Sequence, residues 1–278
     1  MSGIEAVREA FCRAQAQGRP ALIFYWPVGY PDLEASIQIV AALAEAGADL
    51  IELGLPFSDP LADGPVIQRA TQRALERGVR TPHVLEAAAR LRAMGVRRPL
   101  CLMTYINPVM AWGIPRFLAE AIQAGIHGLI VPDLPLEEAE ELQVAAGALG
   151  LAWVPLAAPT TPDERLARLA ATATGFLYLV SVTGITGARD RLPVDVVTHL
   201  RRARRAANGV PVALGFGISR PEHVRALAPE ADGLIIGSAL LQLGEASGFD
   251  EEALSAFVRT LREAISISGL SVRDAFLP

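Results

Sequence analysis

Two carboxylates stand near each other where general acid–base chemistry could use them. Glu52 interrupts the apolar run of residues 50–53, which has the composition of a buried strand, and Asp63 follows in the next loop, ahead of Pro65. A glutamate inside a buried strand is rare unless it is paired or takes part in chemistry. An acid at the end of a strand and a second acid in the loop behind it favour proton transfer between the protein and a substrate.

Glycine-rich turns follow three of the later apolar runs. They are TGITG at 183–187, GFG at 215–217 and GS at 237–238. Glycines let backbone N–H groups approach an anion closely, and a helix beginning near Ser238 would add the positive end of its dipole. The joint placement of these turns predicts a phosphate site, whereas any one of them alone could equally be an ordinary tight turn.

The chain contains no lysine, so its Lys+Arg total of 25 consists of arginines. This composition excludes a Schiff-base mechanism, because the covalent intermediate needs a lysine amine as nucleophile. His83, His127, His199 and His223 are expected in helices or just ahead of a strand, away from the catalytic face. They form no HxH or HExxH spacing, so no metal site is predicted.

Composition narrows the class of protein. With 278 residues, 51% of them hydrophobic, the chain can bury a large core, and one α/β barrel of about 250 residues is as natural as two domains. A formal net charge of −5 offers no basic groove to a nucleic acid. No apolar run approaches the ~20 residues that span a bilayer, and the first residues lack the pattern of a secretion signal. We therefore expect a cytoplasmic protein with neither membrane nor nucleic-acid partners.

Apolar runs of strand length alternate with longer helical patterns, as in βα units around a parallel sheet. Eight strands are expected, at residues 22–25, 50–53, 100–104, 129–131, 152–156, 176–181, 212–214 and 233–236. Extra helices are expected before the first strand and, as the pair 66–77 and 83–94, between the second and third. The sequence predicts one (β/α)8 TIM barrel domain over residues 1–278, with the two acids and the glycine turns at the carboxyl ends of the strands, where barrel chemistry gathers.

Six segments, in this order along the chain, resemble one enzyme family. They are IELGLPFSDPLADGPVIQRA, LMTYINPV, VPDLP, YLVSVTGITGARDRLP, GFGIS and GSAL. Together they are similar to the alpha subunit of tryptophan synthase, from about residue 5 to residue 265. The resemblance implies a lyase of tryptophan biosynthesis that splits indole-3-glycerol phosphate into indole and glyceraldehyde 3-phosphate, without a metal or cofactor in this chain.

The resemblance also implies roles for individual residues. Glu52 corresponds to the acid–base that moves a proton between the substrate hydroxyl and indole C3, and Asp63 to the aspartate that accepts from the indole N–H. Tyr105 and Tyr178 match tyrosines of the substrate pocket, although a tyrosine at a strand end is often simply core. Thr186 resembles the threonine that meets that aspartate when a loop shuts over the site. The implied phosphate-binding residues are Gly187, Gly215, Phe216, Gly217, Gly237 and Ser238.

A partner subunit is implied as well. The family works as an αββα complex, in which the beta subunit uses pyridoxal phosphate to join indole with serine. In this chain the contacting surface would be Phe57, Ser58 and Asp59 together with Asn107 and Pro108. The same apolar, proline-rich rim could be ordinary loop packing.

The match departs from the family pattern around the first strand. Members commonly have a threonine where this chain has Pro27. The proline removes a hydroxyl and a backbone N–H near the aromatic end of the substrate. We expect this difference to affect the shape of the pocket and leave the class of reaction unchanged.

Two other classes of function stay open beside the lyase. A metal-free phosphosugar isomerase or epimerase would also use paired acids, but a pocket lined by Tyr25, Trp26, Phe57 and Tyr105 suits a flat aromatic group better. We therefore predict that Tyr25 binds substrate. A non-catalytic subunit that only activates a partner would be indicated by loss of either acid, and both are present.

Overall fold

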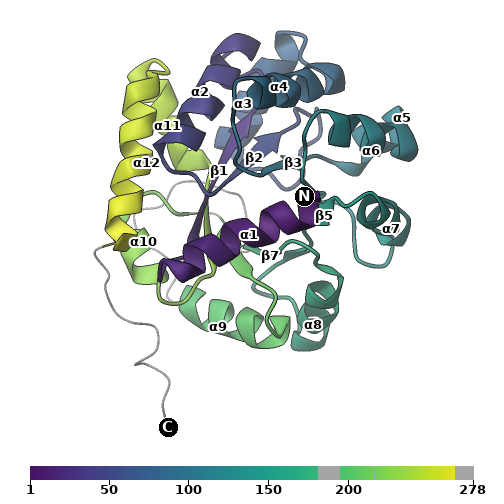
Figure 1. The fold of residues 1–278 in the computed structure, drawn as a ribbon, viewed down its shortest axis with the longest axis vertical. Helices are drawn as coiled ribbons and strands as arrows, with labels where there is room; N and C mark the ends of the chain where they lie inside the picture. The colour runs from purple at the N-terminus through teal and green to yellow at the C-terminus, as the bar shows by residue number, and fades with distance from the viewer. Residues whose placement is uncertain (181–194, 216, 267–278) are drawn as a thin grey trace.

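Nine parallel strands form one sheet in the computed structural model, which describes residues 1–180, 195–215 and 217–266 (Figure 1). The strands are β1 (Ala21–Pro27), β2 (Leu50–Gly54), β3 (Leu100–Met103), β4 (Gly128–Ile130), β5 (Ala152–Trp153), β6 (Leu156–Ala157), β7 (Leu177–Val180), β8 (Val212–Gly215) and β9 (Gly233–Ile236). Their order in the sheet is β5-β4-β3-β2-β1-β9-β8-β7-β6. Nearly every strand residue is buried, as parallel strands covered by helices require.

The two strands at the ends of this order, β5 and β6, are separated in the chain only by Val154 and Pro155. On one side the Val154 amide donates to the Leu129 carbonyl at 3.1 Å, and on the other the Pro155 carbonyl accepts from the Tyr178 amide at 3.0 Å. β5 and β6 are therefore two halves of the single strand expected at 152–156, interrupted because Pro155 has no N–H to donate. The sheet closes on itself, and the predicted (β/α)8 barrel is confirmed.

Helices surround the barrel (Figure 1). They are α1 (Gly3–Ala16), α2 (Leu33–Ala46), α3 (Pro65–Glu76), α4 (Thr81–Ala93), α5 (Ile106–Trp112), α6 (Ile114–Gln123), α7 (Glu140–Ala148), α8 (Asp163–Thr172), α9 (Val196–Ala207), α10 (Pro221–Leu227), α11 (Ser238–Ser247) and α12 (Glu251–Ser266). The helix before β1 and the pair α3 and α4 confirm the predicted additions. The pair α5 and α6 was not predicted; it is divided by Gly113, whose φ of +85° an α-helix cannot continue through. Within the described ranges, no helix is both long and apolar enough to cross a bilayer.

Helix α1 lies across the amino-terminal end of the barrel (Figure 1). The Ile4 amide donates to the Gly150 carbonyl at 3.0 Å, and the Phe11 ring packs on Phe176 with 5.2 Å between centroids. These contacts bury the apolar face of an amphipathic helix against the ends of the strands. The amino-terminal end is thereby covered, and the carboxyl end is left for the site.

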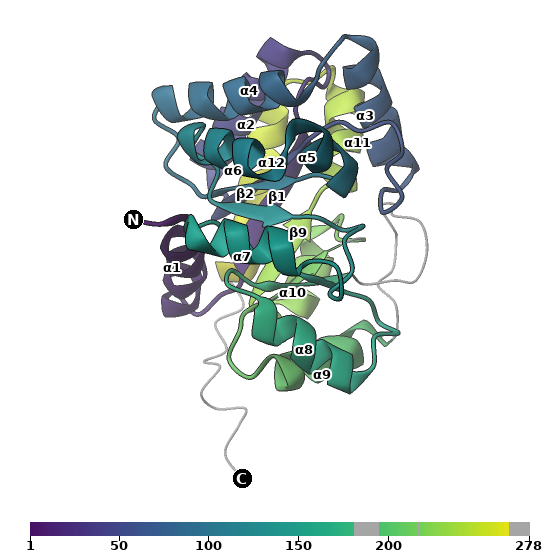
Figure 2. The same ribbon diagram turned by 90° about the vertical axis from the view of Figure 1, so that its right-hand side faces the viewer.

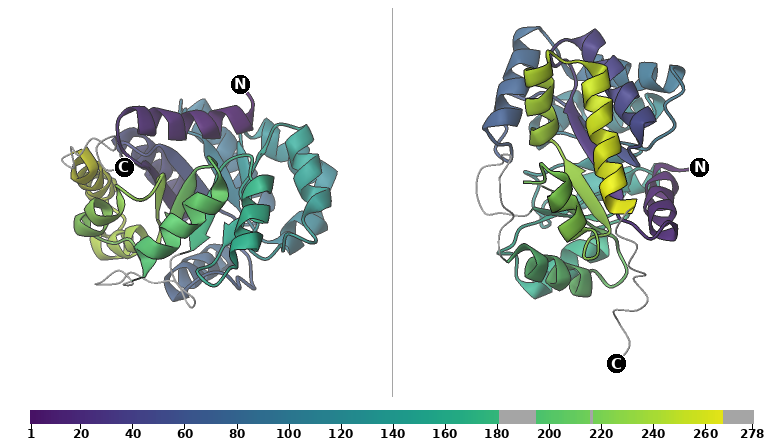
Figure 3. Two further views of the ribbon diagram at one scale, coloured as in Figure 1. Left: turned by 90° about the horizontal axis from the view of Figure 1, so that it is seen from below. Right: turned by 90° about the vertical axis from the view of Figure 1, so that its left-hand side faces the viewer.

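An ion-pair network fastens the same end. Asp49, just ahead of β2, accepts from Arg19 at 2.6 and 2.9 Å and from the Leu22 amide at 2.9 Å. Arg262 of α12 adds a third basic contact, at 2.9 Å. Because the Arg19 and Asp49 side chains are almost fully buried, removal of either partner would leave a buried charge uncompensated. Helix α12, which lies beside α11 on the outside of the barrel (Figure 3), is tied to the barrel in this way.

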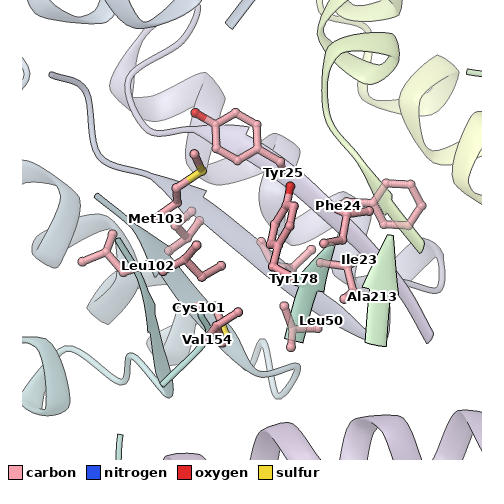
Figure 4. Packing of buried hydrophobic residues seen from close by; sticks show 14 of the residues in the cluster. Ile23, Phe24, Tyr25, Leu50, Cys101, Leu102, Met103, Val154, Tyr178 and Ala213 are labelled. Carbon is pink, nitrogen blue, oxygen red and sulfur yellow. The ribbon is translucent and has the colours of Figure 1, made fainter. Parts of the chain in front are cut away.

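The register of the strands brings particular side chains to one level inside the barrel. Tyr25 of β1 pairs with Glu52 of β2, which pairs in turn with Cys101 of β3. Since side chains alternate between the two faces of a strand, Tyr25 points inward while Phe24 points away from the interior (Figure 4). The cavity described below opens at this level.

Candidate active site

Glu52 lies in the middle of β2 with its side chain inside the barrel. The residue is 0% exposed, and neither carboxylate oxygen has a hydrogen-bond partner among the described residues. Burying a carboxyl group without a partner is costly, and such groups are concentrated where chemistry needs them. The structure thus places Glu52 inside a strand, as the sequence predicts.

Asp63 ends the loop after β2, directly before Gly64 and the first residue of α3, Pro65. Its backbone is held on both sides, because its amide donates to the Pro60 carbonyl at 3.1 Å and its carbonyl accepts from Gln68 Nε2 at 2.8 Å. The side chain is buried, and its Oδ1 atom has no hydrogen-bond partner in the described part of the chain. A tightly fixed loop therefore aims this second carboxyl group into the same cavity as Glu52.

Burial raises the pKa of both carboxyl groups. For Glu52, burial and then repulsion from Asp63 raise the pKa to about 8. For Asp63, burial raises the pKa to about 7, opposed by the Tyr105 hydroxyl, which acts to lower it. Both the charged and the neutral form of the pair are accessible near neutrality, which is what a group that gives and takes a proton needs.

Tyr25 of β1 and Tyr178 of β7 line the same cavity and are almost fully buried. Two glycines make room for them. A Cβ on Gly54 would lie 2.3 Å from the Tyr25 hydroxyl oxygen, and one on Gly215 would lie 2.5 Å from the Tyr178 ring. Burial, followed by the charges of the two carboxylates, raises the pKa of both phenols, so both stay protonated. Each can therefore donate a hydrogen bond to a bound substrate.

Tyr105 joins the end of β3 to the loop that carries Asp63. Its hydroxyl accepts from the Ala62 amide at 3.1 Å, and its ring stacks on Phe57 with 5.4 Å between centroids. Tyr105 is itself buried. Tyr105 lies beside Asp63 and supports the loop, but it is not among the residues that line the cavity described next, so its contact with substrate stays a prediction.

The cavity lies at the carboxyl ends of the strands. Its lining is Tyr25, Glu52, Asp63, Ile67, Met103, Tyr178, Gly217, Ile218, Ile235, Gly237, Ser238 and Ala239. Of the predicted phosphate-binding residues, Gly217, Gly237 and Ser238 face it, while Gly215 is the last residue of β8 and packs against the Tyr178 ring instead. Thr186, Gly187 and Phe216 lie outside the described residues.

Five apolar lining residues were missed in the sequence: Ile67, Met103, Ile218, Ile235 and Ala239. Met103 could have been found, because it lies two residues beyond Cys101 on β3 and so shares its inward face. The others come from two helices, a loop and a fully apolar strand, where residue type carries no sign of direction. Together they supply most of the apolar lining of the cavity.

The expectation that Trp26 lines the pocket is wrong. Trp26 is 0% exposed, and its indole N–H donates to the Tyr30 carbonyl at 2.8 Å. Its ring lies against α11, where a Cβ on Gly244 would come within 3.0 Å of it. As the neighbour of inward-facing Tyr25, Trp26 points to the outer face of β1, between barrel and helix.

The predicted partner surface lies beside this end of the barrel. Ser58, Asp59 and Asn107 are exposed, whereas Phe57 and Pro108 are half-buried. Leu61, in the same loop, is 87% exposed. The Asn107-Pro108 segment belongs to α5, whose first amide, that of Ile106, donates to the Asp133 carboxylate at 3.0 and 3.2 Å.

No group of three or more His, Cys, Asp or Glu side chains within the described ranges is arranged to hold a metal ion. The Glu52 and Asp63 carboxyl groups have features that suit proton transfer. Their burial, their raised pKa values and their shared cavity fit that use.

Solved structures resemble this barrel over almost its whole length. A tryptophan synthase structure from Mycobacterium tuberculosis is 36% identical, with a TM-score of 0.86, and the match covers 94% of this chain and 98% of that one. The tryptophan synthase alpha chain of Legionella pneumophila is 32% identical, with a TM-score of 0.86, over 98% of this chain and all of that one.

Relatives known by sequence agree. The tryptophan synthase alpha chain of Carboxydothermus hydrogenoformans is 48% identical over 239 residues, which is 86% of this chain and 89% of that protein. The alpha chain of Chloroflexus aggregans is 47% identical over 260 residues, 94% and 97% of the two chains. The family model described as tryptophan synthase alpha chain matches residues 11–265. The chain therefore belongs to the tryptophan synthase alpha chain family, the lyases that cleave indole-3-glycerol phosphate.

Proposed function

We propose that this chain cleaves indole-3-glycerol phosphate with Glu52 as the acid–base and Asp63 as the carboxylate that stabilises the cationic ring. The observation that carries this proposal is that two buried carboxyl groups face one cavity, and that both Glu52 oxygens and Asp63 Oδ1 have no hydrogen-bond partner among the described residues. Such oxygens are available to a substrate at no cost in broken protein contacts.

The reaction needs two proton transfers, one to indole C3 and one from the hydroxyl on the carbon attached to C3. Protonation of indole C3 places positive charge on the ring nitrogen, and an ionised Asp63 beside that N–H stabilises the charge most in the transition state. Removal of the proton from the hydroxyl on the attached carbon then forms the aldehyde C=O. The carbon–carbon bond breaks, and its electron pair returns to the ring and neutralises it. A single group with a raised pKa, Glu52, can give the first proton and take the second.

The two ends of the substrate differ in chemistry, and the cavity lining holds residues suited to each. Ile67, Met103 and Ile235 suit the flat indole ring, and Tyr25 and Tyr178 belong to the same lining. Tyr105 is proposed to act from beside Asp63, behind this lining. The phosphate is assigned to the side of Gly217, Gly237 and Ser238, where α11 begins, because backbone N–H groups and the helix dipole favour an anion there. Gly187 and Phe216 are the remaining proposed phosphate contacts, and Thr186 is proposed as a substrate-site residue that meets Asp63. Gly215 packs against the Tyr178 ring and is left out of this set.

The family implies a beta-subunit partner and a phosphorylated indole substrate. We assign the partner surface to Phe57, Ser58, Asp59, Asn107 and Pro108, in an α2β2 complex. Pyridoxal phosphate is assigned to the beta subunit, and no cofactor is assigned to this chain. The chain itself is expected to be located in the cytoplasm. The exposed Leu61, in the same loop, extends the proposed surface with an apolar side chain.

Indole release from indole-3-glycerol phosphate, measured with the purified chain alone and with a beta subunit from the same source, tests this function. Release that rises sharply with the partner supports both the chemistry and the complex. Absence of release under both conditions would overturn the proposed function. Release that is unaffected by a beta subunit shown to be active would overturn the partner assignment alone.

A further inference from the structure

The hydroxyl of Tyr30 lies between two helices that flank the site. It donates to Glu245 Oε1 of α11 at 2.6 Å and accepts from Arg73 Nη1 of α3 at 3.3 Å. The Arg73 guanidinium also lies 6.0 Å from the centre of the Tyr30 ring. Because Glu245 and Arg73 carry opposite charges, one phenol joins a cationic donor to an anionic acceptor.

Each of these helices begins at one end of the proposed substrate site. Helix α3 starts at Pro65, two residues after Asp63, and α11 starts at Ser238, directly after Gly237. The two helices touch each other and lie side by side in Figure 2. Their separation therefore determines how far the acid–base end of the site lies from the phosphate end.

Tyr30 is well placed to fix that separation because its backbone and its ring are both held by neighbouring residues. Its residue exposure is 1%, its carbonyl accepts from the Trp26 indole at 2.8 Å, and its ring meets Phe249 edge-on at 5.2 Å. Burial and the Glu245 contact raise the pKa of Tyr30 to about 12, so the hydroxyl keeps its proton at neutral pH. At neutral pH the Tyr30 hydroxyl can therefore always donate its hydrogen bond to Glu245 of α11.

We propose that Tyr30 is a positioning residue, which through Arg73 and Glu245 sets the distance between Asp63 and the phosphate-binding start of α11. This role rests on the proposed function, because it presumes a ligand that is held at both ends. Such a ligand gains affinity only when both ends are correctly spaced, whereas a ligand held at one end is indifferent to the spacing.

The test compares a two-ended ligand with its separate halves on the Tyr30→Phe variant, which keeps the ring and removes the hydroxyl. The ligands are indolepropanol phosphate, inorganic phosphate and indole. We expect the variant to bind indolepropanol phosphate roughly five- to tenfold more weakly and each half within about twofold of wild type, since one charge-assisted hydrogen bond is lost. Glu245→Gln, which keeps an oxygen acceptor, should bind like wild type, and Glu245→Ala should behave like the Tyr30 variant.

The control is Asp49→Asn, which destabilises the barrel at its opposite end and should leave the ratio of two-ended to one-ended affinity unchanged. If Tyr30→Phe leaves that ratio unchanged, or if Asp49→Asn alters it equally, the positioning role is overturned. If wild-type protein binds indolepropanol phosphate no better than phosphate alone, the proposed function fails and this inference fails with it.

Discussion

Glu52 and Tyr25 occupy paired positions on β2 and β1, and both side chains line the same cavity. The pairing sets a carboxyl group that titrates near neutrality next to a phenol that stays protonated. Solvent screens the interaction between the two groups only weakly, because Glu52 is 0% and Tyr25 5% exposed. Repulsion from Asp63 contributes to the raised pKa of Glu52, so the two carboxyl groups should titrate as a pair.

The raised pKa values predict a stability that falls with pH. Between the unfolded value of 4.5 and the folded value of about 8, folded Glu52 binds more protons than the unfolded chain does, so the free energy of unfolding decreases as pH rises. Glu52→Gln lacks this contribution. We expect wild-type stability relative to the variant to fall by at most about 1.4 kcal/mol per pH unit across that window. Urea unfolding of both proteins at several pH values measures it, and parallel pH profiles would contradict it.

A negative charge at the proposed phosphate side should separate the two halves of the site. We expect Gly217→Asp to weaken phosphate-bearing ligands by roughly tenfold or more, through like-charge repulsion, and to affect indole much less. Gly217 has φ of +83°, so backbone strain must be controlled. Gly248→Asp is the matched control, because Gly248 has φ of +67°, nothing within 4 Å of its Cβ position and no place in the cavity lining. Equal weakening of indole and phosphate ligands by Gly217→Asp would argue against the assignment.

Glu52 and Asp63 could be singled out in the sequence because a charge within an apolar run, or before a helix start, is visible by residue type alone. The direction of Trp26 could not. All seven residues of β1 are buried, so no polar alternation shows which ones face the interior. The division of β5 from β6 follows from Pro155, which is visible in the sequence but which the prediction of one strand at 152–156 does not treat as a break.

Gly215 illustrates a residue whose sequence signal has two explanations. It stands in a glycine turn, which predicts an anion site, but its missing side chain also makes room for the Tyr178 ring. Gly217, two residues later, faces the cavity. Sequence alone cannot separate a glycine needed by a ligand from one needed by a neighbouring ring, since both uses demand the absence of Cβ.

The packing of Gly215 against Tyr178 predicts a local cost. We expect Gly215→Ala to lower the free energy of unfolding by about 1–3 kcal/mol and to reduce cleavage, because the new methyl group forces the ring to move. Gly147→Ala is the control. Gly147 lies in α7 with nothing within 4 Å of its Cβ position, so alanine there should stabilise by about 0.5–1 kcal/mol. Thermal melts and indole release measure both, and a Gly215→Ala protein as stable as wild type would refute the packing explanation.

Proton transfer by the Glu52 carboxyl group can be measured as indole release by the Glu52→Gln variant in single-turnover experiments. The variant keeps the shape of the side chain, so its circular dichroism spectrum should match wild type. We predict that its cleavage rate falls by a factor on the order of 100 or more, while Glu138→Gln, at an exposed glutamate, stays within about twofold of wild type. A folded Glu52→Gln protein that releases indole within a few-fold of the wild-type rate would show that Glu52 does not carry the proton.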